Sequence, residues 1–426
     1  MKYDLIVVGG GPGGLMAAKT AAEDGLKVLL IERKRDITEI NRACTQIFYI
    51  DAIMPSWEIE EGERRSDGYI EPVSVEVLPE KSRFIFPAPG FSVDYDGILV
   101  PYYNWTMVSP SGYYLQTRKP NEKIWGFYFQ KEVLLAGLLS SVEKAGAEVL
   151  TETLALGAEN TPDGVKVLVR GKSGEQTLEA RKAIAADGVA SRIAESLGLN
   201  KNRQAMTPPI KILAYDMEGV ETEFPRYSFL SIAFHRLGLL GSVGIGLRAE
   251  DRVWFYTMTA GSASPSAVLD NFMKHPKYAS WFRHARVVKK TAGATTLHTP
   301  IWEPVTGNVV VVGDAGAPVE TWVQGALACG YMAVKAIEKE LNGQKGYPEY
   351  IGWWQKAFYF HNPKYHQRVA GFNLNRECSG EELDYLYRLF QGRVGWLQGM
   401  VSHNLDLVKR DRPELYEKLA KGLGVV

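Results

Sequence analysis

The sequence predicts an α/β fold, α+β overall, built on a parallel sheet whose strands come from separate parts of the chain. Three observations predict this class. A strand, a helix and a second strand follow one another over residues 4–32, and a further fully apolar strand stands at residues 308–313. Between them, alternating strand-like runs predict an antiparallel β-rich domain. With 426 residues, the chain is long enough for two or three domains.

The composition is that of a folded protein without a nucleic-acid partner. Hydrophobic residues make up 46% and charged residues 23%, and 49 basic residues are balanced by 49 acidic ones without a Lys/Arg block. The 3 cysteines, Cys44, Cys329 and Cys378, are too few and too scattered for a disulfide framework or a metal site. Because the N-terminus also lacks the pattern of an export signal, we expect a cytoplasmic protein.

The first 32 residues read as a Rossmann-like βαβ unit. Residues 4–8 and 27–31 are short apolar runs, as the strands of a sheet covered on both faces require. The Ala-rich stretch 15–24 between them ends at Gly25, which predicts a helix. The remaining predicted elements are strands at 73–77, 147–150, 165–169, 182–186 and 309–312, helices at 131–145, 266–274 and 324–341, and a helical region over 345–426.

A glycine-rich turn joins the first strand to the first helix, and an acid ends the next strand. Glycines let the backbone approach a pyrophosphate, and the helix N-terminus favours its negative charge. The acid accepts hydrogen bonds from a ribose hydroxyl, which favours FAD or NAD over a phosphorylated ribose. We therefore expect a cofactor site at Gly9, Gly11, Pro12, Gly13, Gly14, Glu32 and Arg33.

Two later strands end in similar turns. Residues 309–312 lead into Gly313 and Asp314, where an acid followed by small residues can bind a polyol beside a bulky cofactor. Another strand leads into Asp187 and Gly188, a pair that is also common in plain turns. In this order, the three motifs resemble the glutathione-reductase-type FAD fold, in the branch that contains para-hydroxybenzoate hydroxylase and the geranylgeranyl reductases. The resemblance implies FAD as the cofactor, with Asp314 at its ribityl chain.

The same resemblance implies roles for three further side chains. Gln130 matches a polar residue that contacts the flavin nucleotide, and Arg42 matches one that meets the pyrophosphate. From the residues alone, a solvent-facing helix end and a surface charge are equally ordinary explanations. Cys44 stands where several geranylgeranyl reductases place a cysteine beside the flavin, although most free cysteines are inert packed thiols.

The start of the helix at 324–341 is the other predicted catalytic element. Its first residues are expected to direct backbone N–H groups at the flavin. With Cys44, Gln324 and Gly325 are therefore the catalytic candidates, and Gly325 and Ala326 are counted among the cofactor contacts.

The chain also departs from both branches of the family. The hydroxylases have a His after their Gly-Asp-Ala-Ala run, whereas residues 313–318 contain none, which favours reduction. Prenyl reductases carry a Y-x-W-x-F-P segment before a strand like 241–247, whereas this chain has a different sequence at 229–236. The substrate is therefore expected to be apolar, without a firm assignment to the isoprenoids.

The resemblance implies an FAD-dependent oxidoreductase that reduces a carbon–carbon double bond of an apolar, isoprenoid-type substrate by hydride transfer from flavin N5. The alternative is a flavin-dependent monooxygenase that hydroxylates or epoxidises an aromatic or apolar substrate, and a third reading is a flavoprotein electron carrier. The electron donor could be NAD(P)H, a ferredoxin or a quinol.

Domain boundaries follow from these segments. We expect an FAD-binding domain at 1–70, 121–205 and 298–342, and a β-rich substrate-binding domain at 71–120 and 206–297. Residues 343–426 form a C-terminal helical region. It could cover the active site, form an oligomer contact or make peripheral contact with a membrane surface.

Overall fold

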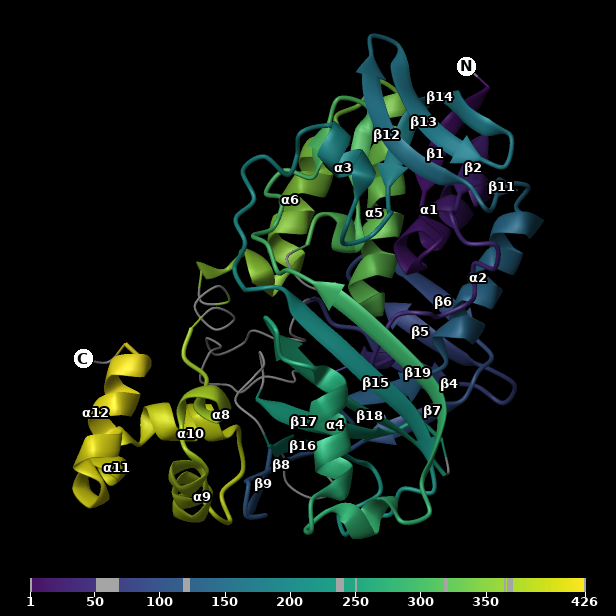
Figure 1. The fold of residues 1–426 in the computed structure, drawn as a ribbon. Coiled ribbons are helices and arrows are strands. Elements are labelled where there is room, and N and C mark those ends of the chain that lie inside the picture. The colour runs from purple at the N-terminus through teal and green to yellow at the C-terminus, as the bar shows by residue number, and fades with distance from the viewer. Residues whose placement is uncertain are drawn as a thin grey trace.

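The computed structural model describes residues 2–50, 69–117, 123–234, 241–249, 251–317, 321–363, 365 and 371–424 (Figure 1). Within them, an eight-stranded sheet contains the predicted parallel strands. β1 (Tyr3–Val8) pairs in parallel with β2 (Val28–Ile31) and β14 (Gly174–Ala185), and β21 (Val309–Val311) joins β14 in parallel. The strand near residue 310 therefore returns to the first sheet, as predicted. The other strands are β11 (Glu148–Leu150), β12 (Leu154–Thr161), β13 (Gly164–Gly171) and β20 (Val305–Thr306).

Both faces of this sheet are apolar, because successive side chains of its strands point to opposite faces. Leu5 and Val7 share one core with the buried faces of α1 (Pro12–Glu23), α2 (Lys131–Lys144) and α5 (Trp322–Leu341). Ile6 and Val8 face the other core, which includes residues of β13 and of the short α3 (Arg192–Ser196). The helices predicted at 131–145 and 324–341 are confirmed.

A seven-stranded sheet forms the second part of the fold, below the first in Figure 1. Its neighbours are antiparallel except for β16 and β8, and α4 (Pro265–Lys274) packs against it, so the antiparallel module and its helix are confirmed. In order across the sheet, its strands are β19 (Arg286–Thr295), β15 (Ile210–Glu218), β18 (Arg252–Ala260), β17 (Ser242–Leu247), β16 (Ser228–Ala233), β8 (Asn104–Val108) and β9 (Tyr114–Gln116).

Two small sheets lie between these parts, and one of them differs from expectation. Within residues 71–120, only β8 and β9 join the seven-stranded sheet. The strands at 74–95 form their own sheet, and Phe84 stacks on Phe48 at 4.2 Å within the core of α1 and α2, because alternate aromatic side chains of β5 point inward. The small sheets are β3 (Ile47–Tyr49), β10 (Gly126–Phe129) and β7 (Leu99–Tyr102), and β4 (Ser74–Val77), β5 (Ser82–Phe86) and β6 (Phe91–Tyr95).

The C-terminal region is helical, as predicted. α6 (Tyr347–Ala357) packs on α5, while the later helices extend beside β8 and β9 at the lower left of Figure 1 and share a core with Met107 and Leu115. Among the described helices, none combines the length and the apolar character needed to cross a bilayer. The later helices are α8 (Leu374–Glu377), α9 (Gly380–Leu389), α10 (Leu397–His403), α11 (Leu405–Asp411) and α12 (Pro413–Gly422).

Candidate active site

A cavity of about 850 Å³ lies where the parallel strands end. Its lining includes Val8 and Ile31, the last residues of β1 and β2, and Ala186, which follows β14. The carboxyl ends of parallel strands are the usual ligand position in such sheets. The volume is in the range of small-molecule and cofactor pockets.

The glycine-rich turn forms one wall of this cavity. Gly9 has a φ of +106°, and a Cβ there would lie 2.3 Å from the Ala186 carbonyl oxygen. A Cβ on Gly14 would lie 1.8 Å from the Gly9 carbonyl oxygen. At Gly11, the N-cap of α1, a Cβ would meet no atom within 4 Å. Gly9 and Gly14 therefore allow the backbone to fold tightly, and Gly11 leaves space where the N-terminus of α1 meets the cavity.

Glu32 closes the turn from the end of β2. Its Oε2 accepts a hydrogen bond of 2.7 Å from the Gly10 N–H, and its Oε1 accepts one of 2.9 Å from the Lys34 N–H. The side chain is buried, yet it lines the cavity together with Arg33. The structure thus places a fixed carboxylate at the position where the sequence predicts a ribose contact.

Arg42 and Asp314 meet at the cavity although 272 residues separate them. Arg42 Nη2 donates a hydrogen bond to Asp314 Oδ2 at 3.0 Å. The other carboxylate oxygen, Asp314 Oδ1, accepts a hydrogen bond from the Thr321 N–H at 2.9 Å. Asp314 lies in a 3₁₀ turn, Gly313–Ala315, directly after β21. The pair brings an acid and a base predicted from separate motifs into one site.

Asp187 lines the cavity and also shapes the chain after β14. Its carboxylate accepts from Ser191 Oγ at 2.6 Å and from the Arg192 N–H at 2.8 Å, which fixes the start of α3. Burial raises the pKa of Asp187, although these hydrogen bonds oppose the shift. Gly188 has a φ of +83° and lines the cavity beside it. The turn is therefore both a local structural device and part of the wall.

Gln130 does not reach the cavity. Its side-chain oxygen accepts a hydrogen bond from the Ile98 N–H at 3.2 Å, and its backbone N–H donates to the Tyr95 hydroxyl. Lys131, one position later at the start of α2, lines the cavity instead. A shift of one residue turns a helical side chain by about 100°, so at this helix end Lys131 lines the cavity and Gln130 does not.

At the start of α5, the side chains also divide between the core and the cavity. The Gln324 amide nitrogen donates to the Tyr49 carbonyl at 3.1 Å, and a Cβ on Gly325 would lie 2.7 Å from a ring carbon of Phe358. Both residues therefore face the protein core and not the cavity. Trp322, Val323 and Ala326 form the cavity-facing side of the same helix. Trp322 has a φ of +59°, a left-handed conformation that is uncommon for a bulky residue.

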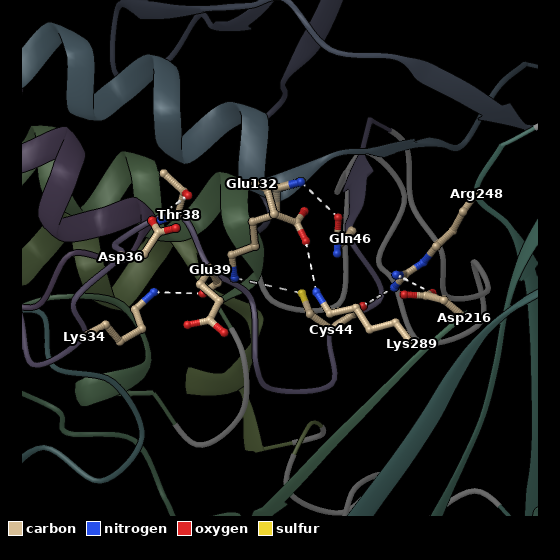
Figure 2. A network of polar contacts seen from close by, with 11 residues as sticks. Lys34, Asp36, Thr38, Glu39, Cys44, Gln46, Glu132, Asp216, Arg248 and Lys289 are labelled. Carbon is tan, nitrogen blue, oxygen red and sulfur yellow. Dashed lines mark hydrogen bonds and ion pairs between the residues drawn. The ribbon is translucent and has the colours of Figure 1, made fainter. Parts of the chain in front are cut away.

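Cys44 lines the cavity from the loop before β3 (Figure 2). The Lys131 Nζ lies 4.0 Å from its sulfur. The Gln46 side-chain oxygen accepts a hydrogen bond from the Lys131 N–H at 2.9 Å, and Arg248 from the antiparallel sheet donates to the Cys44 carbonyl at 2.5 Å. Sequence reasoning missed Lys131, Gln46 and Arg248, since no local motif marks them.

The donor set of the cavity fits a flavin dinucleotide. The open Gly11 at the N-terminus of α1 and the side chains of Arg33 and Arg42 offer N–H groups and positive charge to a diphosphate. Glu32, at the end of β2, and Asp314, after β21, provide carboxylate oxygens that can accept hydrogen bonds from hydroxyl groups of the cofactor. The aromatic residues around Trp125 do not line this cavity. They pack on one another, with Tyr102 and Trp125 at 5.3 Å, and form core.

Comparison with known protein families agrees with this assignment. Residues 4–37 match a family described as FAD dependent oxidoreductase, and residues 105–297 match one described as FAD binding domain. The digeranylgeranylglycerophospholipid reductase of Methanocaldococcus jannaschii is 27% identical over 380 residues, covering 84% of this chain and 83% of its own. Digeranylgeranylglycerophospholipid reductase 2 of Methanothermobacter thermautotrophicus is 26% identical over 97% of this chain and 98% of its own.

Solved structures share the fold at low sequence identity. A geranylgeranyl bacteriochlorophyll reductase-like protein from Thermoplasma acidophilum has a TM-score of 0.67 at 19% identity, with 98% of each chain covered. The p-nitrophenol 4-monooxygenase of Pseudomonas putida has a TM-score of 0.64 at 15% identity, covering 96% of this chain and 98% of its own. Fold and site define an FAD-dependent oxidoreductase. Within that class, the chain is similar over most of its length to digeranylgeranylglycerophospholipid reductases.

Proposed function

We propose that this protein uses bound FAD to reduce carbon–carbon double bonds in the isoprenoid chains of a lipid. The observation that carries the proposal is the match to digeranylgeranylglycerophospholipid reductases over 84% to 97% of the chain, joined to a cavity with FAD-type donors. The sequence has no His at residues 315–318, directly after Asp314, and this pattern, which favours reduction over hydroxylation, supports the same function.

Specific residues would hold the cofactor. The N-terminus of α1, with Gly11, Pro12 and Gly13, and the Arg42 side chain would bind the diphosphate. Glu32 would accept hydrogen bonds from the ribose, and Asp314 would accept them from the ribityl hydroxyls. Fold and cavity support these roles, because all six residues line the same space.

The domain assignment follows from the same argument. Residues 1–70, 121–205 and 298–342 would form the FAD-binding domain, and 206–297 with β8 and β9 the substrate-binding domain. The sheet of β4, β5 and β6 would belong to the FAD-binding domain, because its side chains pack in the core of that domain. The helices of 343–426 would flank the substrate side, since their core includes residues of β8 and β9. The thiols of Cys44 and Cys329 are consistent with the reducing cytoplasm that the sequence predicts.

When bound and reduced, FAD supplies a hydride to one carbon of the double bond. The chain itself has to hold the alkene beside the cofactor, exclude water and provide a proton for the second carbon. Cys44 lies at the cavity wall where such a proton donor would be needed.

An anaerobic half-reaction tests the proposal. The FAD-loaded protein is reduced with dithionite and mixed with digeranylgeranylglycerophospholipid in detergent. We expect flavin reoxidation without oxygen and a lipid that gains two hydrogen atoms for each double bond, seen by mass spectrometry. If no isoprenoid lipid reoxidises the flavin while an air pulse produces a C4a-oxygen adduct, a monooxygenase replaces this function. The physiological donor is then sought by replacing dithionite with NAD(P)H, a ferredoxin or a quinol.

A further inference from the structure

The loop that carries Cys44 is fixed from two sides. On one side, Gln46 has a φ of +54°. Its side-chain oxygen accepts a hydrogen bond from the Lys131 N–H at the start of α2, and its backbone carbonyl accepts one from the Phe129 N–H at the end of β10. On the other side, Arg248 holds the Cys44 carbonyl. These contacts therefore fix the backbones of Cys44 and Lys131 close together, and the sulfur lies 4.0 Å from the Lys131 Nζ.

Lys131 stands at an unfavourable place for a lysine. It is the first residue of α2, where the helix dipole disfavours a positive charge, and its side chain is buried. Among the described residues, no carboxylate forms an ion pair with it, and the Cys44 sulfur is its polar side-chain partner. The neighbouring Lys34 adds to the positive charge. Burial lowers the pKa of Lys34, the Glu32 charge opposes that shift, and the Lys131 charge adds to it. Such a cation requires an anion nearby.

We propose that Lys131 supports the Cys44 thiol as the proton donor of the reaction, by stabilising the thiolate that remains after the proton has left. This inference rests on the proposed function. In the step, the S–H bond of Cys44 breaks and a C–H bond forms on one alkene carbon, while the hydride from the reduced cofactor forms the C–H bond on the other. The sulfur keeps the electron pair of the broken bond, and water returns its proton after product release. Lys131 keeps its own protons throughout.

Arg248 is the positioning residue of this pair. Its guanidinium lies between the rings of Tyr128 and Trp254, at 5.5 Å and 5.3 Å, and donates to Asp216 at 2.7 Å. Burial raises the pKa of Asp216, while the Arg248 charge opposes the shift. A side chain held by these contacts sets the Cys44 carbonyl, and with it the sulfur, from the seven-stranded sheet.

Thiol reactivity provides the test, because only the thiolate reacts readily with iodoacetamide. The FAD-loaded full chain is alkylated at neutral pH, and the Cys44 peptide is followed by mass spectrometry. Ultraviolet thiolate absorbance, taken as the difference from Cys44→Ala, gives the same fraction without a reagent. Cys329 and Cys378 are buried, with 0% and 1% exposure, and give little background. We expect Lys131→Met to lower the alkylation rate about fivefold or more, and to lower kcat without a matching rise in KM.

Matched variants separate this role from a general loss of charge. Lys289→Met removes a cation whose partner is Glu132, next to Lys131, at 3.6 Å, and should leave the alkylation rate within about twofold. Lys131→Arg should restore most of it. Lys131→Gln serves if the Met variant does not fold.

Each outcome decides between the possibilities. Equal alkylation in Lys131→Met and Lys289→Met overturns the inference while leaving the reductase function intact. A Lys131→Met protein that loses FAD affinity but keeps its Cys44 reactivity also overturns it, and assigns the lysine to the cofactor diphosphate. If instead alkylation slows as expected but the wild type reduces no isoprenoid lipid, the cysteine–lysine pair is real and the proposed function fails.

Discussion

The contact between α1 and α5 gives a sharp prediction about the cofactor site. Gly330 of α5 lies against the backbone of α1, where a Cβ would stand 2.2 Å from the Gly13 carbonyl oxygen and 3.0 Å from the Ala17 nitrogen. Both of these atoms belong to a helix backbone and cannot rotate away. Gly330→Ala therefore forces the two helices apart by about 1 Å, since such contacts need at least about 3.2 Å.

The expected cost follows from this overlap. Overpacking of a well-packed core costs about 1–3 kcal/mol, and the rigid backbone here places the value at the upper end. Alanine regains up to about 1 kcal/mol of helix propensity. The net loss of unfolding free energy is about 2 kcal/mol, a factor of about 30 in the folded-to-unfolded ratio. Because Gly13 belongs to the cofactor wall, we also expect weaker FAD binding.

Gly137→Ala is the matched control. Gly137 lies within α2 on an exposed face, and a Cβ there would meet no atom within 4 Å, so this substitution should stabilise the protein by about 0.5–1 kcal/mol. Thermal unfolding and FAD titration by flavin fluorescence measure both effects. If Gly330→Ala unfolds like the wild type and keeps its FAD affinity, the close helix contact, and the reasoning built on it, is wrong.

Three further predictions concern single side chains. Glu32→Gln replaces a carboxylate that accepts hydrogen bonds from the Gly10 and Lys34 N–H groups. We expect FAD affinity, measured by fluorescence titration, to fall about tenfold. An unchanged affinity would exclude Glu32 from the cofactor site. Arg248→Met leaves Asp216 buried without its ion-pair partner and should lower the free energy of unfolding by about 3–5 kcal/mol in a denaturant titration. Arg252→Met, which breaks a more exposed pair with Glu218, should lower it by about 1 kcal/mol or less. Equal losses in the two variants would contradict this prediction. Burial raises the pKa of Cys329 to about 12 in the folded protein, against about 9 in the unfolded chain. The stability that the protonated thiol provides is therefore complete below about pH 9 and is lost as the pH rises from about 9 to about 12, so by about pH 10 the wild type should lose about 1.4 kcal/mol of unfolding free energy that Cys329→Ala keeps. Parallel curves of stability against pH for the two proteins would refute this prediction.

The parallel core and its glycine turn could be predicted because their signals are local. Gly9, Gly13, Gly14 and Glu32 act within one βαβ unit, and their spacing alone requires a tight turn followed by an acid. The pairing of Arg42 with Asp314 spans 272 residues. Only the resemblance to a known family brought these two residues to the same cofactor before the fold was known.

The predicted contacts at two helix starts differ from the residues that line the cavity. Lys131 lines it and Gln130 does not, and Trp322, Val323 and Ala326 line it whereas Gln324 and Gly325 do not. Periodicity identifies a helix but does not fix its first residue, and at the first turn a shift of one residue moves a side chain to another face. The role of Arg248 could not be predicted for a different reason, since it reaches Cys44 across 204 residues and no motif connects them.

The contacts of the Cys44 loop also join the cofactor cavity to the antiparallel part of the fold. The Ala43 N–H donates to the Ala292 carbonyl of β19 at 3.1 Å, and Arg248, which directly follows β17 of the same sheet, donates to the Cys44 carbonyl. The sulfur itself faces the cavity at the ends of the parallel strands. Both contacts attach the backbone of the Cys44 loop to the antiparallel part of the fold, so we expect a substitution at either of them to displace the thiol at the cavity.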